Sequence, residues 1–297
     1  TGLIRDHSGQ KMSKSKGNIL DPLDIINGAT LETLLEKRTD GMMQPHLKKR
    51  IENLTRKEFP KGIPKYGADA LRLTLANLAT TGRDISLDMG RIEGNRNFCN
   101  KLWNASQFVF TNIDHFDEGK PKKHTVADKW IRSRLARIIK SFHKNFAEYR
   151  LDLASQSLYD FIWHEFCDWH LELTKTSLNN PDCPASTRRG TQHCLAEVLG
   201  ALLKLLHPFA PFLTEELWLE LCKKTGRSSE TLMLEPLPEH NQFIQDAKSE
   251  KEIAWMQEFV KGIRQIRGET NINPRWSLDS KKIAYLSNKE RDYFGRT

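Results

Sequence analysis

The sequence is poor in cysteine and has no paired arrangement of cysteines. An odd number of them is spread over the chain, and none forms a CxxC pair: Cys99, Cys167, Cys183, Cys194 and Cys222. This spacing argues against a disulfide framework and against a cysteine zinc site, and it is typical of proteins from a reducing compartment. We therefore expect a cytoplasmic protein with no protein-bound metal ion.

Long apolar runs are also missing. No stretch approaches the roughly 18 apolar residues that a membrane-spanning helix needs. The first residues, 1–6, lack the apolar region of a signal peptide and resemble the middle of a domain. We expect no membrane partner, and we expect the chain to be a fragment of a longer protein.

Acidic residues are fewer than basic ones. Among 297 residues, 46 are Lys or Arg and 38 are Asp or Glu, a net charge of +8. This balance makes a polyanionic partner plausible. The length predicts two or three domains, and the seven tryptophans argue against disorder.

The densest chemical signal lies at residues 11–18. Three lysines and two serines precede Gly17 and Asn18 in the run KMSKSKGN. One interpretation is a mobile loop whose ammonium groups and backbone N–H groups bind phosphate. The other is a solvated basic loop, the usual fate of a short charge run.

The pattern before residue 92 predicts short mixed elements. A strand and turn at residues 1–10 lead to the loop, and Asp21-Pro22 is a helix-start signal. Helices are expected near residues 31–35, at 46–59 and at 64–78, the last burying Leu71, Leu75 and Leu78. Alternation at residues 82–88 predicts a strand.

From residue 91 onward the pattern is helical. Amphipathic helices with short connections are expected at 94–110, 126–147, 153–176, 187–206, 213–223 and 253–267. An extended piece is expected at 232–234, a linker near 119–123 and a strand at 282–286. The predicted fold class is mainly α, an antiparallel helical bundle preceded by a small α+β region.

The first bundle helix carries the best candidate RNA surface. Its cationic and amide side chains are Arg91, Arg96, Asn97, Lys101 and Asn104. Amides read base edges, whereas Arg and Lys anchor phosphates. About half of this set is expected to serve inside the fold instead, as caps or inter-helix hydrogen bonds.

Other groups allow two interpretations each. The basic residues Lys48, Lys49, Arg50, Arg56 and Lys57 either follow a phosphate backbone or form a solvated face. The stripe of Tyr159, Trp163 and Phe166 either stacks on bases or belongs to the bundle core, and its helical spacing favours the core.

Two further groups are best interpreted as structural. His164, Cys167 and His170 lie on one helix, but a separation of six residues turns His170 away from His164, so core packing is favoured over a metal site. The acids Glu215-Glu216 follow Thr214 and are interpreted as helix-start charges.

The order KMSKS, Gly-Asn, Asp21-Pro22 resembles the second signature motif of class I aminoacyl-tRNA synthetases. The resemblance implies that ATP, with Mg²⁺, is bound here and that charge developing at its α-phosphate is stabilised. Lys11 and Lys14 would be the catalytic residues. The ATP-binding loop would consist of Lys11, Met12, Ser13, Lys14 and Ser15.

More motifs follow in the order of one branch of that family. They are Gly82-Arg-Asp-Ile, Arg96-Asn-Phe-Cys-Asn-Lys-Leu-Trp-Asn-Ala, Phe166-Cys-Asp-Trp with Leu171-Glu-Leu, and His207-Pro208. Together they resemble bacterial valyl-tRNA synthetases over nearly the whole chain. Isoleucyl and leucyl enzymes are the alternatives, but many isoleucyl enzymes have leucine where this chain has Lys16.

The resemblance implies a division of labour. Residues 1–18 would end a Rossmann-type catalytic nucleotide-binding domain, 19–92 would contact the tRNA stem, 93–245 would bind the anticodon arm, and 246–297 would begin a C-terminal junction. The implied partners are tRNAVal, ATP and valine, and the implied enzyme is a monomer.

Other parts of such an enzyme are missing from the sequence. None of the ten histidines stands in a HIGH-type signature, and no editing domain or terminal coiled coil is present. We therefore expect the chain alone to be inactive. Two other classes stay open: a non-enzymatic basic helical RNA-binding module and a structural helical scaffold.

Overall fold

The computed structural model describes residues 2–6, 9–13, 16–40, 45–80, 82–113 and 122–270. The chain divides into two compact units, Thr1–Gln245 and Asp246–Thr297. Helices make up most of the described residues, so the prediction of a mainly α fold is confirmed. The predicted linker near residue 119 falls largely outside the described residues, and the predicted strand at 282–286 does so entirely.

The only sheet among the described residues is small. Strand β1 (Ile4–Arg5) pairs in parallel with β2 (Ile85–Ser86), with Ile4 opposite Ile85. Both predicted strands exist, but each is shorter than the alternating pattern indicated. This pairing brings the start of the chain beside a segment about eighty residues later.

Three short helices follow the lysine loop. Helix α1 (Pro22–Asn27) begins with Pro22 in its first turn and is capped by Asp21, which accepts a hydrogen bond from the Leu23 N–H at 2.9 Å. Helix α2 (Leu31–Thr39) packs against α3 (Lys48–Glu58), which is preceded by a 3₁₀ turn at Pro45–Leu47. The predicted helices in these regions are thereby confirmed.

Helix α4 (Ala68–Leu78) begins four residues later than predicted. Gly67 has φ +87°, and the N–H groups of Tyr66 and Gly67 bond to the carbonyls of Ile25 and Ile26 instead of starting a helix. The prediction that Leu75 and Leu78 are buried like Leu71 is wrong, because both are only half-buried. The buried face instead includes positions 70, 71, 73 and 74, since α4 packs against both α5 and α7.

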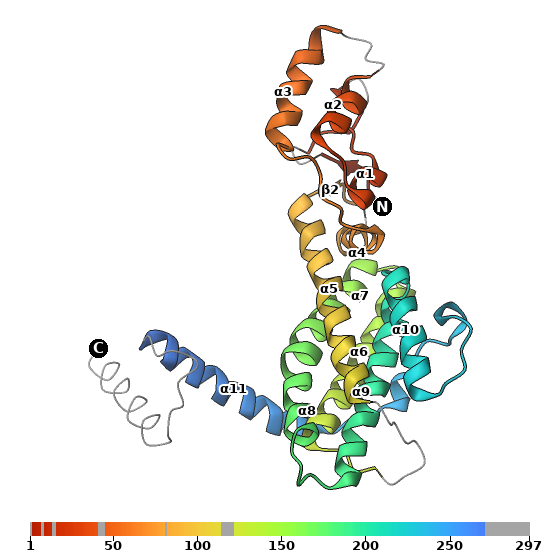
Figure 1. Ribbon diagram of the computed structural model, residues 1–297, viewed down its shortest axis with the longest axis vertical. Coiled ribbons are helices and arrows are strands. Elements are labelled where there is room, and N and C mark those ends of the chain that lie inside the picture. Colours follow the sequence, from red (N-terminus) through yellow and green to blue (C-terminus); the bar gives the residue numbers. More distant parts are fainter. Residues whose placement is uncertain are drawn as a thin grey trace. The chain divides into compact units, whose positions relative to one another are not determined.

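Helix α5 (Met89–Asn112) is longer than predicted and begins five residues earlier. Asp88 caps it by accepting a hydrogen bond from the Gly90 N–H at 2.9 Å. The helix runs without a break from the β2 region into the bundle (Figure 1). No interruption of secondary structure therefore marks the predicted boundary between residues 92 and 93.

Helix α6 (Val126–Ala147) has the predicted bounds. Thr125 and Asp128 form a reciprocal capping box at its start. The third bundle helix is continuous but not uniform. It consists of α7 (Leu151–Asp160), a π-helical segment (Phe161–His170) and α8 (Leu171–Leu178).

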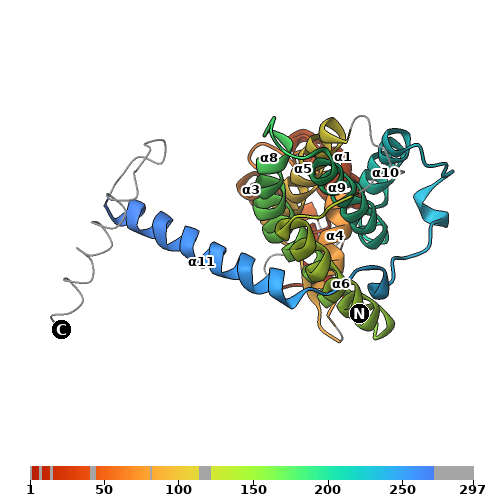
Figure 2. The same cartoon turned by 90° about the horizontal axis from the view of Figure 1, so that it is seen from below.

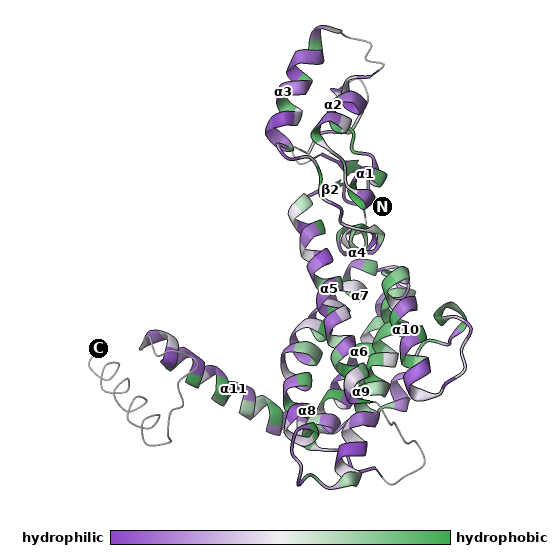
Figure 3. Ribbon diagram, viewed as in Figure 1, coloured by the Kyte–Doolittle hydropathy of each residue, from purple (hydrophilic) through white to green (hydrophobic). Residues whose placement is uncertain are grey.

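Helix α9 (Ala185–Leu206) is the most buried helix of the bundle. It contacts α5, α6, α7, α8 and α10 (Pro211–Thr225), and the view along the bundle places it among its neighbours (Figure 2). Its ribbon is largely hydrophobic toward the C-terminal end, whereas α3 is mostly hydrophilic (Figure 3). The bundle core therefore forms around α9.

Two predictions near α10 are wrong. Leu232–Leu234 is a 3₁₀ turn, not an extended piece. Glu215 does not act as a helix-start charge, because α10 begins at Pro211 and the Glu215 carboxylate accepts hydrogen bonds from the Leu232 N–H and the Thr231 hydroxyl. A further 3₁₀ turn follows at His240–Gln242.

The second unit contains one described helix, α11 (Ala247–Glu269), capped by Asp246. Trp255 and Phe259 stack on each other on its surface, with ring centroids 5.6 Å apart. No helix among the described residues is long and apolar enough to cross a membrane.

Candidate functional site

The lysine loop is held at both ends by the side chain of Asn18. Its Nδ2 donates to Asp6 Oδ2 at 2.8 Å and to the Lys11 carbonyl at 3.3 Å, and its Oδ1 accepts from the Ser13 N–H at 2.9 Å. One amide thus uses donor and acceptor together, which an aspartate or a leucine cannot do. This brace explains why an asparagine follows the loop.

Gly17 lets the chain leave the loop. It has φ +61°, which other residues rarely adopt, and a Cβ here would lie 2.6 Å from a side-chain carbon of Ile51 on α3. The Lys16 N–H closes a turn onto the Ser13 carbonyl at 3.1 Å. The exit of the loop is therefore packed directly on α3.

The loop residues divide into an anchor and exposed groups. Met12 packs against a buried cluster of Ile25, Ala70, Leu71 and Leu87. Lys11 is exposed, and its backbone pairs with Arg5. Lys14 and Ser15, both predicted to bind ATP, lie outside the described residues.

The entrance to the loop is fixed by Asp84. Its carboxylate accepts a hydrogen bond from the Leu3 N–H at 2.8 Å and forms an ion pair with Arg5. The Leu3 N–H first, and then the Arg5 guanidinium, lower the pKa of Asp84. The negative charge of Asp84 therefore connects β1 to the segment before β2.

The predicted RNA-binding residues on α5 separate into two groups. Arg91, Asn97 and Asn104 are exposed, although Arg91 lies within 3.8 Å of Asp88. Arg96 lies over the Tyr66 ring at 5.5 Å. Its guanidinium also approaches Glu93.

Lys101 is the most engaged member of the predicted set. Its Nζ lies 2.5 Å from Asp168 Oδ1 and 3.9 Å from the centroid of the Trp163 ring. It therefore joins α5 to the π-helical segment. The exposed part of the predicted surface contains two amides and one arginine.

The aromatic stripe belongs mainly to the bundle. Phe166 is fully buried, and Tyr159 stacks on Phe98 at 4.7 Å and on Trp163 at 5.7 Å. The predicted core role is confirmed for Phe166, whereas Tyr159 and Trp163 are half-buried. By contrast, the basic side chains of α3 are all exposed: Lys48, Lys49, Arg50, Arg56 and Lys57.

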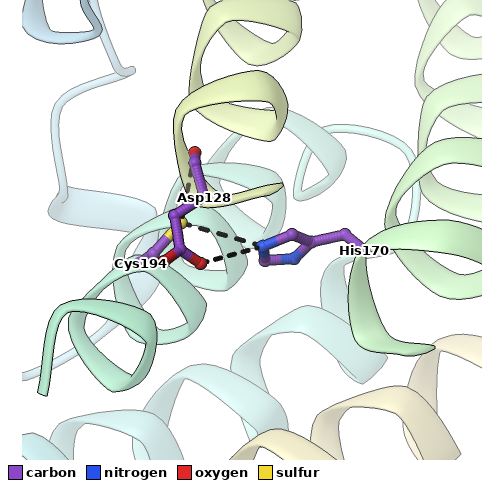
Figure 4. A group of neighbouring side chains, drawn as sticks. All are labelled: Asp128, His170 and Cys194. Carbon is purple, nitrogen blue, oxygen red and sulfur yellow. Dashed lines mark hydrogen bonds and ion pairs between the residues drawn. The ribbon is translucent and has the colours of Figure 1, made fainter. Parts of the chain in front are cut away.

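Sequence analysis did not find a buried polar cluster in the bundle. Asp128 of α6, His170 of the π-helical segment and Cys194 of α9 converge with no side chain accessible to solvent (Figure 4). The sequence predicted that His164, Cys167 and His170 do not form a metal site. Their positions agree with this, since His164 is exposed and His170 is buried.

The cluster is not a Cys–His–Asp catalytic relay. Asp128 Oδ1 and Cys194 Sγ both face the same nitrogen, Nε2 of His170, at 3.5 and 3.9 Å. A relay needs the acid and the nucleophile on different ring nitrogens. Burial raises the pKa of the Cys194 thiol well above its usual value, so the thiol is not activated.

Two family models match the chain. The model described as "tRNA synthetases class I (I, L, M and V)" matches residues 1–88, which hold the lysine loop, and "Anticodon-binding domain of tRNA ligase" matches residues 128–283. The chain belongs to the family of the anticodon-binding domain of tRNA ligases. The two matches together confirm the resemblance to aminoacyl-tRNA synthetases that the motifs indicated.

Valine–tRNA ligases are similar to this chain over most of its length. The ligase of Stenotrophomonas maltophilia (strain R551-3) is 51% identical over 276 residues, 92% of this chain and 29% of the relative. The ligase of Xanthomonas oryzae pv. oryzae (strain PXO99A) is 50% identical over 277 residues, which are 92% of this chain and 28% of the relative. The chain spans less than a third of these relatives.

A solved synthetase shares the fold. The leucyl enzyme of Agrobacterium radiobacter K84 agnB2, in a ternary complex with tRNA and LeuAMS, matches with a TM-score of 0.51 and 19% identity. The match covers 81% of this chain and 23% of that one. At this identity the similarity concerns the fold alone.

Proposed function

We propose that the chain is part of a valine–tRNA ligase, in which it supplies the lysine loop of the ATP site and the helices that bind the anticodon arm of tRNAVal. The observation that carries the proposal is the 51% identity to a valine–tRNA ligase over 92% of the chain. The reaction would attach valine to tRNA through valyl-adenylate, and the enzyme would act as a monomer in the cytoplasm.

In this proposal the loop stabilises charge that develops during attack on the α-phosphate of ATP. Lys11 is exposed and its backbone is fixed by Asn18, so its side chain is free to turn toward a phosphate. Lys14 would supply the second ammonium group, while the Ser13 and Ser15 region binds ATP with Mg²⁺. Met12 would hold the loop to the fold, because its side chain packs against the buried cluster that includes Ile25 and Leu71.

In this proposal, the rest of the ATP site would lie in a part of the enzyme outside this chain. We therefore expect the isolated chain to show no valine-dependent exchange between ATP and pyrophosphate. Exchange that Lys14→Ala abolishes would contradict this part of the proposal.

The tRNA surface would consist of the exposed members of the predicted set. Asn97 and Asn104 supply amides for base edges, and Arg91 supplies a phosphate contact. Arg96 and Lys101 would act indirectly, because each is held by neighbours in the fold. The basic face of α3 would follow the phosphate backbone of the stem.

Filter binding tests the recognition of tRNA by the isolated chain. Binding of tRNAVal should weaken steeply as salt rises, because phosphate contacts release counterions. Asn97→Ala and Asn104→Ala should reduce the preference for tRNAVal over the same tRNA with a changed anticodon, whereas Arg91→Ala should weaken both equally. No preference in the unchanged chain would overturn the assignment of anticodon recognition.

An isoleucyl- or leucyl-type ligase is the second candidate, since these enzymes share the matched family model. It would be favoured if tRNAIle or tRNALeu bound more tightly than tRNAVal. Equal, salt-sensitive binding of all these tRNAs would instead favour a basic RNA-binding module without enzymatic function.

A further inference from the structure

Three potential metal ligands meet in the interior of the bundle. Asp128 lies in the first turn of α6, His170 ends the π-helical segment and Cys194 lies on α9 (Figure 4). Their ligand atoms all lie within 4.8 Å of one another, and all three residues are fully buried. They are drawn together from positions 24 to 66 residues apart.

Two side-chain atoms of this cluster lack a hydrogen bond within the described part of the chain, although the Cys194 thiol donates one to the Asp128 carbonyl oxygen at 3.7 Å. Asp128 Oδ1 and His170 Nδ1 have no hydrogen-bond partner among the described residues. The distance of 3.5 Å from His170 Nε2 to Asp128 Oδ1 exceeds that of a normal N–H···O bond. Apart from this contact Oδ1 has no partner in the described ranges, and a buried carboxylate oxygen without a hydrogen bond is costly, so its presence calls for an explanation.

Two of the three distances between the ligand atoms are close to the edges of a metal tetrahedron. With zinc bonds of about 2.0–2.1 Å to nitrogen and oxygen and about 2.3 Å to sulfur, neighbouring ligand atoms stand about 3.3 and 3.6 Å apart. The observed separations from Nε2 are 3.5 Å to oxygen and 3.9 Å to sulfur. Movements of a few tenths of an ångström would close these two edges.

We propose that Asp128, His170 and Cys194 bind a divalent cation of the zinc class. The ligand set of a carboxylate, an imidazole and a thiolate is one that zinc takes, and three protein ligands leave the fourth position for a solvent molecule. Binding displaces the thiol proton of Cys194 to solvent and forms the metal–sulfur bond. One carboxylate, one thiolate, a neutral imidazole and a doubly charged ion sum to zero charge in the core.

The other oxygen of Asp128 is already held in place. Oδ2 accepts hydrogen bonds from the Thr125 N–H at 2.9 Å, the Thr125 hydroxyl at 2.8 Å and the Thr191 hydroxyl at 2.9 Å. These contacts turn Oδ1 toward His170 and Cys194. Outer contacts of this kind orient ligands in metal sites.

The π-helical segment is the second feature that singles out this place. π-Helices are rare, usually single turns, and frequently occur at functional sites. Here the segment covers ten residues and ends at His170. The unusual backbone therefore delivers the imidazole to the other two ligands.

Cobalt titration of the metal-depleted chain, free of any histidine tag and kept reduced, tests the proposal. We expect one equivalent of Co²⁺ to bind with a thiolate charge-transfer band in the near ultraviolet. Cys194→Ser should remove the band, whereas Cys222→Ser, at a buried cysteine on α10, should keep it. Likewise, His170→Asn should abolish tight binding, and His164→Asn, at an exposed position, should not.

A variant outside the ligand set tests the outer contact. Thr191→Val removes one hydrogen bond to Oδ2 and should weaken Co²⁺ binding about 10- to 100-fold. Unchanged affinity in Thr191→Val would contradict this orienting contact and with it the geometry proposed for Asp128.

A measurement on the unchanged chain keeps the proposal testable if a variant does not fold. X-ray absorption of the zinc-loaded chain should show one sulfur ligand together with nitrogen and oxygen ligands. A shell without sulfur, or no zinc retained after dialysis against metal-free buffer, would overturn the proposal. The cluster would then be a buried carboxylate, imidazole and thiol held together without a metal ion.

Discussion

The carboxylate of Asp69 on α4 accepts a hydrogen bond from the backbone N–H of Leu213 in the first turn of α10, at 2.7 Å. It also accepts one from the Phe212 N–H at 3.4 Å. Helix α10 has no side-chain cap of its own at Ala210, so α4 supplies it. Because neighbouring residues of α4 pack against Met12, one helix connects the lysine loop with the bundle.

Removing this cap should destabilise the chain. Asp69→Ala should lower the free energy of unfolding by about 1–2 kcal/mol, the usual cost of losing a helix cap. Asp69→Asn keeps an oxygen acceptor and should lose less. Urea denaturation measures both, and an equal loss in the two variants would show that the hydrogen bonds to α10 are not the cause.

Gly17 should not tolerate alanine. Its φ of +61° and the close approach of Ile51 predict a loss of about 1–3 kcal/mol in the free energy of unfolding of Gly17→Ala. The matched control is Gly94→Ala on α5, where a Cβ meets nothing within 4 Å, so that helix propensity should stabilise the chain by up to about 1 kcal/mol.

A double-mutant cycle separates steric contact from backbone strain at Gly17. If the clash contributes, Ile51→Ala and Gly17→Ala should be less costly together than the sum of the two single changes. Additive losses would leave the positive φ as the sole cause.

The side chain of Asn18 should control the opening of the lysine loop. Asn18→Ala removes hydrogen bonds to Asp6, Lys11 and Ser13, each contributing about 1 kcal/mol, so local opening should become at least about tenfold more frequent. The rate of trypsin cleavage after Lys11 and Lys16 measures how often the loop opens. Asn100→Ala, at an exposed position on α5, serves as the control, and equal cleavage rates would refute the brace.

Stability should fall in acid through Glu235. The Lys204 ammonium first, at 2.9 Å, and the Ser229 hydroxyl, at 2.8 Å, lower the pKa of the Glu235 carboxyl below its usual value of 4.5. A lowered folded pKa stabilises the fold above the unfolded pKa, and this contribution disappears as pH falls through the folded pKa.

The matching variants are Glu235→Gln and Glu220→Gln. Below about pH 5, the free energy of unfolding should depend less on pH in Glu235→Gln than in the unchanged chain, whereas Glu220→Gln should behave like the unchanged chain. Glu220 is a control because it lies on α10 and pairs with Lys223 at the surface. Identical acid profiles of Glu235→Gln and the unchanged chain would contradict the assigned role of the Lys204 contact.

The sequence was most informative where local signals agree. Helix α6 has its predicted bounds because Thr125 and Asp128 form a capping box before a clear apolar periodicity. The Asp21-Pro22 signal was equally local, and α1 begins at Pro22 with Asp21 as its cap.

Features that depend on contacts between distant segments were not predicted from the sequence. The start of α4 is set by backbone bonds from Tyr66 and Gly67 to α1, which periodicity does not reveal. Glu215 was misinterpreted because its partners lie beyond the end of α10. Asp128, His170 and Cys194 share no local motif, since each comes from a different element of the bundle.

The central claim is tested most directly in a chimera. The 276-residue segment of the Stenotrophomonas maltophilia ligase that aligns with this chain would be replaced by this chain's residues. We predict that the chimera charges tRNAVal with valine and that Lys14→Ala within it abolishes charging while tRNA binding persists. A folded chimera that binds tRNAVal but does not attach valine, or whose activity survives Lys14→Ala, would contradict the account.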